Sequence, residues 1–224
     1  MRIIFLGLPG SGKGTQARIL AKKLNAPFVG MGDILRSLSH QTTPLAHQIK
    51  AIMNKGEFIV DDQLIVDIFL EHVAPLASFV GEGAPRSVRQ HTLLKKGLAQ
   101  TNQKIDSFVY LDIQPDQAVN RLQGRIVCLS CGAPYGPHDA PQEGCRVCGA
   151  STLGKRDDDT SLEVIERRLT LQKEREEALV DACAEEGRLH RIDASLSPEE
   201  TALSIEQKLV DCADGGVLIG GKVR

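Results

Sequence analysis

A glycine-rich loop close to the N-terminus constrains the fold of this chain more than any other feature. Residues 7–15 read Gly-Leu-Pro-Gly-Ser-Gly-Lys-Gly-Thr; they follow an apolar run at residues 3–6 and precede a helical pattern that begins near Lys13. Glycines let the backbone curl until successive N–H groups point inward, and the N-terminal end of a helix adds positive potential. The strand, loop and helix start therefore predict a P-loop that binds nucleotide phosphates, with Lys13 reaching the outer ones.

The spacing within this loop narrows the class of protein further. Gly7, Gly12 and Lys13 satisfy the P-loop pattern GxxxxGK, but Gly14 displaces the usual hydroxyl residue to Thr15. A loop that ends in Gly-Lys-Gly-Thr resembles the nucleoside monophosphate kinases, adenylate kinases above all, more than it resembles GTPases or transport ATPases.

The composition excludes several other classes. The chain has 224 residues, of which 42% are hydrophobic, and a formal net charge of −2. This length predicts one core, with or without insertions, and the near-neutral charge predicts no broad attraction to nucleic acid or to an anionic membrane. No apolar stretch approaches the roughly 20 residues that a membrane span needs. We therefore expect a soluble, cytoplasmic protein that binds neither nucleic acid nor membrane.

Apolar runs of strand length alternate with helical patterns along most of the chain. The runs cover residues 3–6, 78–82, 108–112 and 189–193, and helices are expected near 13–24, 33–39, 44–54, 61–73, 87–99, 115–123, 161–186 and 197–210. This alternation predicts an α/β fold whose parallel sheet carries helices on both faces. Residues 30–59 read as a helical insertion, residues 124–160 lose periodicity and gain Gly, Pro and Cys, and residues 211–224 read as a loose tail.

Several arginines stand where loops are expected to meet the P-loop, and their order extends the resemblance to adenylate kinases over nearly the whole sequence. They are Arg36, Arg86, Arg121, Arg125 and Arg156. The resemblance implies a P-loop NTPase-type fold with a core at residues 1–29, 60–123 and 161–210, a segment at 30–59 that binds the nucleoside monophosphate (NMP), and a lid at 124–160. It also implies a monomer that catalyses ATP + AMP = 2 ADP.

The same resemblance assigns roles to individual residues. Catalysis falls to Lys13, Arg86, Arg125, Arg156 and a helical arginine, which is Arg167 by its distance from the preceding aspartates but Arg168, which we favour, by its neighbour Leu169. ATP binding is assigned to Gly10, Ser11, Gly12, Lys13, Gly14, Thr15, Arg121, Arg125, Pro134, Tyr135 and Leu196. AMP binding is assigned to Met31, Arg36, Glu57, Phe58, Ile59, Gly83, Ala84, Pro85, Arg86, Gln90, Arg156 and Arg168 (or Arg167).

A few positions decide how far the resemblance extends to the substrate. Gln90 matches the family's adenine-reading glutamine, whose amide both donates and accepts hydrogen bonds. Glu82 stands where the family mostly has an aspartate, and with Thr15 it is expected to hold Mg²⁺, which prefers oxygen ligands. Ala84 replaces a phenylalanine, and Met31 replaces a threonine that lines the base pocket. A kinase for CMP, UMP or GMP therefore remains an alternative, as does a nucleotide-binding regulatory protein with little catalysis.

Four of the six cysteines form a metal-ligand pattern. Cys128, Cys131, Cys145 and Cys148 give Cys-x2-Cys-x13-Cys-x2-Cys, whereas Cys183 and Cys212 are isolated. Four thiolates suit tetrahedral zinc, and such a closed site has no open position for a substrate, so the Zn²⁺ is expected to be structural. An iron site and two disulfides are the alternatives, and a reducing compartment with a metal fits better than disulfides.

The position of the cysteines extends the resemblance to the lid. They lie between Arg125 and Arg156, similar to the zinc-bearing lid of many bacterial adenylate kinases. Asp158 and Asp159 follow directly, and they either pair with lid arginines or remain solvated in a loop.

Overall fold

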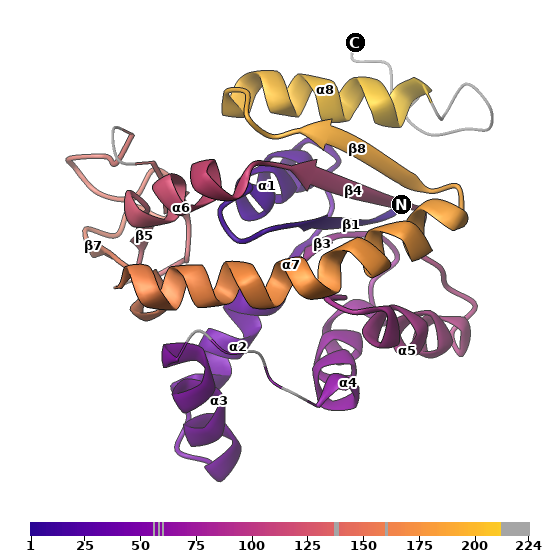
Figure 1. Cartoon of the computed structure of the whole chain (residues 1–224), viewed down its shortest axis with the longest axis horizontal. Helices are drawn as coiled ribbons and strands as arrows, with labels where there is room; N and C mark the ends of the chain where they lie inside the picture. The colour runs from indigo at the N-terminus through magenta and orange to yellow at the C-terminus, as the bar shows by residue number, and fades with distance from the viewer. Residues whose placement is uncertain (56, 58, 60, 137–138, 160, 212–224) are drawn as a thin grey trace.

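The computed structural model describes residues 1–55, 57, 59, 61–136, 139–159 and 161–211 (Figure 1). Its centre is a five-stranded parallel sheet in the order β2-β3-β1-β4-β8. The strands are β1 (Arg2–Gly7), β2 (Phe28–Gly30), β3 (Phe79–Glu82), β4 (Ser107–Asp112) and β8 (Leu189–Asp193). Parallel strands need crossover connections, which the helices between them provide. The predicted α/β architecture is confirmed.

The register of the central strands brings their carboxyl ends to one edge of the sheet. Phe5 of β1 lies opposite Glu82 of β3 and Val109 of β4, so the segments that follow these strands leave the sheet at the same edge. In open parallel sheets this edge is where ligands bind. The P-loop comes directly after β1 and therefore lies at the edge where β3 ends with Glu82.

Helices cover both faces of the sheet. They are α1 (Lys13–Lys23), α4 (Asp62–Val73), α5 (Val88–Ala99), α6 (Pro115–Gln123), α7 (Leu162–Glu185) and α8 (Pro198–Asp211). Ile4 and Leu6 of β1 pack in a cluster with residues of α4, α5 and the C-terminal half of α7, whereas Ile3 and Phe5 pack in a second cluster with residues of α1, α6 and α8. Because both faces are buried, β1 reads as a continuous apolar run.

Two segments extend beyond the sheet and its covering helices. We call residues 30–59 the insertion; it contains α2 (Met31–Ser39) and α3 (Pro44–Asn54), which lie at the bottom of Figure 1. We call residues 124–160 the lid; it forms a three-stranded antiparallel sheet in the order β6-β5-β7. The lid elements are β5 (Ile126–Cys128), β6 (Pro134–Tyr135), β7 (Leu153–Gly154) and the 3-10 helix η1 (Asp157–Asp159).

The structure adds elements that the sequence pattern does not predict. β2 has three residues and ends in glycine, so it is too short to show a strand pattern and is defined by its pairing with β3. The short lid strands are likewise defined by pairing rather than by periodicity. Residues 212–224, most of the predicted tail, lie outside the described residues. Among the helices that are described, none is both long and apolar enough to span a bilayer.

Candidate active site

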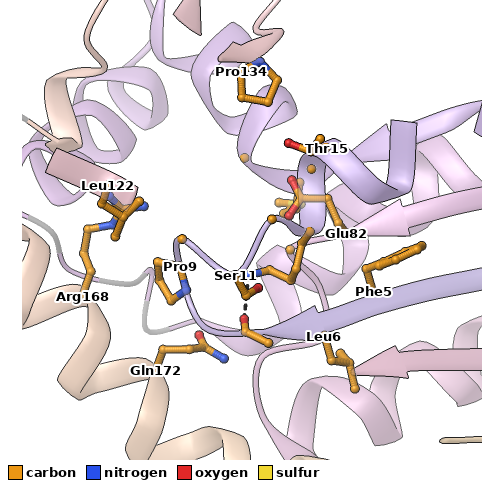
Figure 2. A pocket seen from close by; sticks show the side chains of 18 of the residues that line it. Phe5, Leu6, Pro9, Ser11, Thr15, Glu82, Leu122, Pro134, Arg168 and Gln172 are labelled. Atoms are coloured by element: carbon orange, nitrogen blue, oxygen red, sulfur yellow. Dashed lines mark hydrogen bonds between the residues drawn. The ribbon is translucent and has the colours of Figure 1, made fainter. Parts of the chain in front are cut away.

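A cavity of about 460 Å³ opens at the carboxyl edge of the sheet. The P-loop, α2, the end of β3, the lid, α7 and the segment after β8 all contribute residues to its wall. Figure 2 shows Glu82 and Thr15 on one side of the P-loop, and Arg168 and Gln172 of α7 on the other. Segments that are far apart in the sequence thus converge around the phosphate-binding loop.

The backbone of the P-loop is open toward this cavity. Gly12 has a left-handed conformation (φ 93°) and begins α1 without a side-chain cap, so no side chain occupies the first N–H groups of that helix. Gly10 has a φ of 85°, and a Cβ atom there would lie 2.6 Å from the carbonyl oxygen of Ala118. Ser11 is buried, and its Oγ has no hydrogen-bond partner among the described residues. Such a hydroxyl can donate to a phosphate oxygen.

Lys13 supplies the positive charge of the loop. Its Nζ donates hydrogen bonds to the carbonyl oxygens of Gly7 (2.6 Å) and Leu8 (2.7 Å), which hold the ammonium against the loop. Burial lowers the pKa of Lys13 to about 8, and the attraction of Glu82 and Glu176 opposes this shift. A buried ammonium is stabilised by a nearby anion, so this position favours a phosphate.

Six arginines line the same cavity: Arg36, Arg86, Arg121, Arg125, Arg156 and Arg168. Arg86 donates through Nε to the carbonyl oxygen of Gly83 at 2.9 Å, and burial lowers its pKa. Burial and the positive charges of Arg125 and Arg36 lower the pKa of Arg156 to about 9. Guanidinium groups gathered in this way repel one another, so the site favours a polyanion such as a chain of phosphates.

Two buried carboxylates hold the arginines on the lid side. Asp159, whose side chain is 0% exposed, accepts hydrogen bonds from Nε and Nη2 of Arg125 (2.8 and 2.5 Å) and from Nη1 of Arg168 (2.8 Å). Asp158 forms an ion pair with Arg168 at 3.0 Å. Burial raises the pKa of Asp158, but the positive charges of Arg168 and Arg156 outweigh it and lower the pKa. Of the two expectations for these aspartates, pairing with a lid arginine is confirmed for Asp159, which holds Arg125, whereas Asp158 pairs with Arg168 of α7.

The two neighbouring arginines of α7 have different surroundings. Arg168 is 13% exposed and lines the cavity beside the lid aspartates. Arg167 is 54% exposed and pairs with Glu57 of the insertion at 3.5 Å. The geometry therefore brings Arg168, rather than Arg167, to the other arginines.

Another part of the cavity wall is apolar and includes Met31, Leu35 and Ile59. Gln90 also lines the cavity and is 3% exposed, with both ends of its amide hydrogen-bonded within the protein. A planar base could lie against the apolar wall while Gln90 reads its edge. Ala84, which was expected at this site, does not line the cavity, because it is packed in the apolar core behind it.

The residues expected to hold Mg²⁺ also line the cavity. Glu82 ends β3, and Thr15 lies in the first turn of α1. A carboxylate and a hydroxyl are oxygen donors of the kind that Mg²⁺ prefers, and Mg²⁺ usually keeps several waters as well. This pair of side chains therefore fits the Mg²⁺ ion that accompanies a nucleoside triphosphate.

The four cysteines of the lid come together in space. Their Sγ atoms all lie within 4.8 Å of one another, with 3.6 Å between Cys128 and Cys148 and 3.5 Å between Cys131 and Cys145. Thiolates bound tetrahedrally to zinc lie about 3.8 Å apart, so the donor set fits this metal. None of the described cysteines forms a disulfide, which contradicts the two-disulfide alternative.

Hydrogen bonds support Cys145 within this cluster. The backbone N–H of Arg146 donates to Tyr135 Oη at 3.0 Å, so the phenol hydrogen is left to donate to Cys145 Sγ at 3.1 Å. Burial raises the pKa of Cys145, but the bonds from Tyr135 and from the backbone N–H groups of Cys148 and Val147 outweigh it and lower the pKa to about 6. The thiolate is the form that binds a metal, so these bonds prepare the site for one.

Most residues assigned from the sequence line the cavity. They are Gly10, Ser11, Gly12, Lys13, Gly14, Thr15, Met31, Arg36, Glu57, Ile59, Glu82, Gly83, Pro85, Arg86, Gln90, Arg121, Arg125, Pro134, Tyr135, Arg156, Arg168 and Leu196. Phe58 lies outside the described residues.

Sequence reasoning missed two polar residues of α7 that line the cavity, Gln172 and Glu176. Together with Arg168 they recur every four residues, which places all three on one face of the helix. This spacing is a signal from which they could have been found.

Comparison with known proteins agrees with the geometry. A family model described as adenylate kinase matches residues 5–188. The adenylate kinase of Ruminiclostridium cellulolyticum is 36% identical over 215 residues, which cover 93% of this chain and 99% of the relative. The adenylate kinase of Thermodesulfovibrio yellowstonii is 37% identical over 211 residues, covering 92% and 97%. Because these matches extend over nearly the whole chain, including the P-loop and the lid, the chain belongs to the adenylate kinase family.

Proposed function

We propose that the protein catalyses reversible phosphoryl transfer from Mg-ATP to AMP, which gives two ADP. The observation that carries this proposal is the convergence of Lys13 and six arginines from separate segments on a single cavity. Phosphoryl transfer depends mainly on positioning and on neutralising negative charge, because its transition state spreads charge over the phosphate oxygens. Two substrates that both carry phosphates need a site of this kind.

On the ATP side, we assign the phosphates to the P-loop. Its N–H groups, Ser11 and Lys13 bind the phosphate oxygens, and Arg121 packs against the base. Thr15 and Glu82 hold Mg²⁺, which when bound neutralises charge on the phosphates.

On the AMP side, we assign the phosphate to Arg36 and Arg86 and the base to Gln90. Arg156 and Arg168, with Arg125, stabilise the phosphoryl group in transfer. An oxygen of the AMP phosphate attacks the γ-phosphorus in line, so no covalent intermediate with the protein is needed.

The division into a core, an insertion over AMP and a lid over ATP is part of the same proposal. Enclosing both substrates excludes water, which would otherwise accept the phosphoryl group in place of AMP. The lid is rich in Cys and Gly and has only a small apolar cluster, so we infer that structural Zn²⁺ supplies much of its folding energy. Reduced zinc thiolates also fit a cytoplasmic location. We expect a monomer, as the resemblance to the family implies.

The proposal is tested by a coupled assay of ADP release with Mg-ATP and AMP, CMP, UMP or GMP in turn. Fast turnover with AMP alone supports it. Met31 on the cavity wall favours the alternative of a kinase for CMP, UMP or GMP, since a thioether cannot replace the hydrogen bonds of the threonine hydroxyl that the family has there. Turnover only with another monophosphate would establish that alternative, and turnover with none would indicate a binding or regulatory protein.

A further inference from the structure

Asp62, in the first turn of α4, contacts the side chain of Gln90. Gln90 Nε2 donates to Asp62 Oδ1 at 2.8 Å, and Gln90 Oε1 accepts from the backbone N–H of Arg86 at 2.7 Å. Ser87 Oγ lies 3.4 Å from Asp62 Oδ2 and accepts from the backbone N–H of Gln90 at 3.1 Å. None of the roles assigned above involves Asp62.

These contacts fix the orientation of the Gln90 amide. A carboxylate can only accept and a backbone N–H can only donate, so the NH₂ end must face Asp62 and the carbonyl end must face Arg86. A flipped amide would set its oxygen against the carboxylate and its NH₂ group against an N–H. Because Gln90 is buried, water cannot repair such mismatches.

The amide held in this way keeps one donor and one acceptor for a ligand. Asp62 uses one Nε2 hydrogen and Arg86 uses one lone pair of Oε1, so one of each remains on a side chain that lines the cavity. A purine with an amino group at position 6 offers an N–H to Oε1 and a ring nitrogen to Nε2. A 6-oxo purine instead presents an oxygen to Oε1 and, at its N1 edge, an N–H to Nε2.

We propose that Asp62 is a specificity-determining positioning residue, which selects a 6-amino purine monophosphate over a 6-oxo one by fixing the amide of Gln90. The inference rests on one part of the proposed function, namely that the base of the monophosphate lies beside Gln90. Asp62 acts through Gln90 and does not itself touch the base.

AMP and inosine monophosphate (IMP) are the matched probes, because they differ only at position 6 and in the N1 proton. Asp62→Asn has nearly the same shape, but its side chain can donate or accept, so the contact with the backbone N–H of Arg86 alone has to orient the Gln90 amide. We expect the preference for AMP over IMP in kcat/KM to fall by about tenfold. The change should appear in KM rather than in kcat, since Gln90 is assigned to the base and not to the phosphates.

Asp67→Asn is the matched control. Asp67 also lies on α4 and accepts a hydrogen bond from a glutamine amide, that of Gln63 at 2.7 Å, but both side chains are on the exposed surface. This variant should keep the preference of the parent. Asp62→Ala removes the acceptor altogether and should also weaken the preference, so it provides the test if Asp62→Asn does not fold.

Calorimetric titration with AMP and with IMP, in the absence of ATP, separates this inference from the proposed function. A parent that binds AMP in preference to IMP, and loses that preference on Asp62→Asn, supports the inference even if no phosphoryl transfer occurs. A parent that phosphorylates AMP but binds AMP and IMP equally overturns the inference and leaves the proposed function intact. An unchanged preference in the folded Asp62 variants also overturns it.

Discussion

Replacing Asp159 by Asn should destabilise the protein strongly. The Asp159 carboxylate is fully buried and accepts three hydrogen bonds from Arg125 and Arg168, whose side chains are 18% and 13% exposed. Removing one partner of a buried ion pair costs about 3–5 kcal/mol, because the remaining charge is left without a partner or solvent. Arg168 keeps its pair with Asp158, and asparagine still accepts one bond, so we expect the lower value of about 3 kcal/mol.

This free energy corresponds to a measurable shift in melting temperature. For a chain of this length, each kcal/mol lowers Tm by about 2–4 °C, so Asp159→Asn should lower Tm by about 6–12 °C. Differential scanning calorimetry of the metal-loaded protein measures the shift. Asp139→Asn is the matched control, since Asp139 also pairs with an arginine of the lid, Arg146, but with side chains that are 64% and 56% exposed. Such a surface pair contributes about 0–1 kcal/mol.

A nucleotide should partly restore the stability of the Asp159 variant. Phosphates bring negative charge to Arg125 and Arg168, so saturating ADP should raise Tm more in Asp159→Asn than in the parent. A Tm shift of the variant no larger than that of Asp139→Asn would refute the buried ion pair. An equal ADP effect in parent and variant would refute the idea that phosphate and Asp159 compensate the same arginines.

Three further outcomes are expected. Lys13→Ala should keep the fold and lose about 100-fold or more in turnover, and steady-state rates close to those of the parent would contradict its assignment to the phosphates. Because burial lowers the pKa of Lys13 to about 8, kcat/KM for ATP should decline as the pH rises through this value and the ammonium loses its proton. Glu176→Gln removes a negative charge that raises the pKa of Lys13, so in a pH–rate profile of this variant the decline should occur at lower pH. Chelation of the lid metal should lower Tm. Tyr135→Phe lacks the hydrogen bond to Cys145 and should release zinc to a chelating dye roughly tenfold faster than the parent. Equal release rates in parent and variant would show that the phenol does not support the site.

The features that sequence reasoning predicted are those whose chemistry lies within a short stretch of chain. The P-loop needs only a strand end, a run of glycines and a helix start, and the two cysteine pairs define their own turns. The continuous apolar runs of β1 and β4 reveal buried parallel strands for the same local reason. These signals are sufficient for the fold class and for the P-loop, whereas most other residues of the cavity wall were assigned from the resemblance to adenylate kinases.

The remaining features depend on contacts across the chain. Gln90 was assigned because it matches the family's adenine-reading glutamine, but its contact with Asp62 joins the starts of two helices and depends on the fold. Arg167 and Arg168 are neighbouring residues of the same type, and the rotation of about 100° per helical residue alone decides which of them faces the cavity. The burial of Ala84 likewise depends on how the loop after β3 packs.

Two adjacent arginines of α7 form ion pairs of unequal strength, one with the insertion and one with the lid. Arg167 holds Glu57 of the insertion through an exposed pair, whereas Arg168 holds the buried Asp158 and Asp159 of the lid. Salt screens the exposed pair of Arg167 with Glu57 and has little effect on the buried pairs of Arg168. Rising ionic strength should therefore weaken the contact of the insertion with α7 before that of the lid. If AMP binds beneath the insertion and ATP beneath the lid, as proposed, the exchange rate of AMP should rise with salt while that of ATP does not.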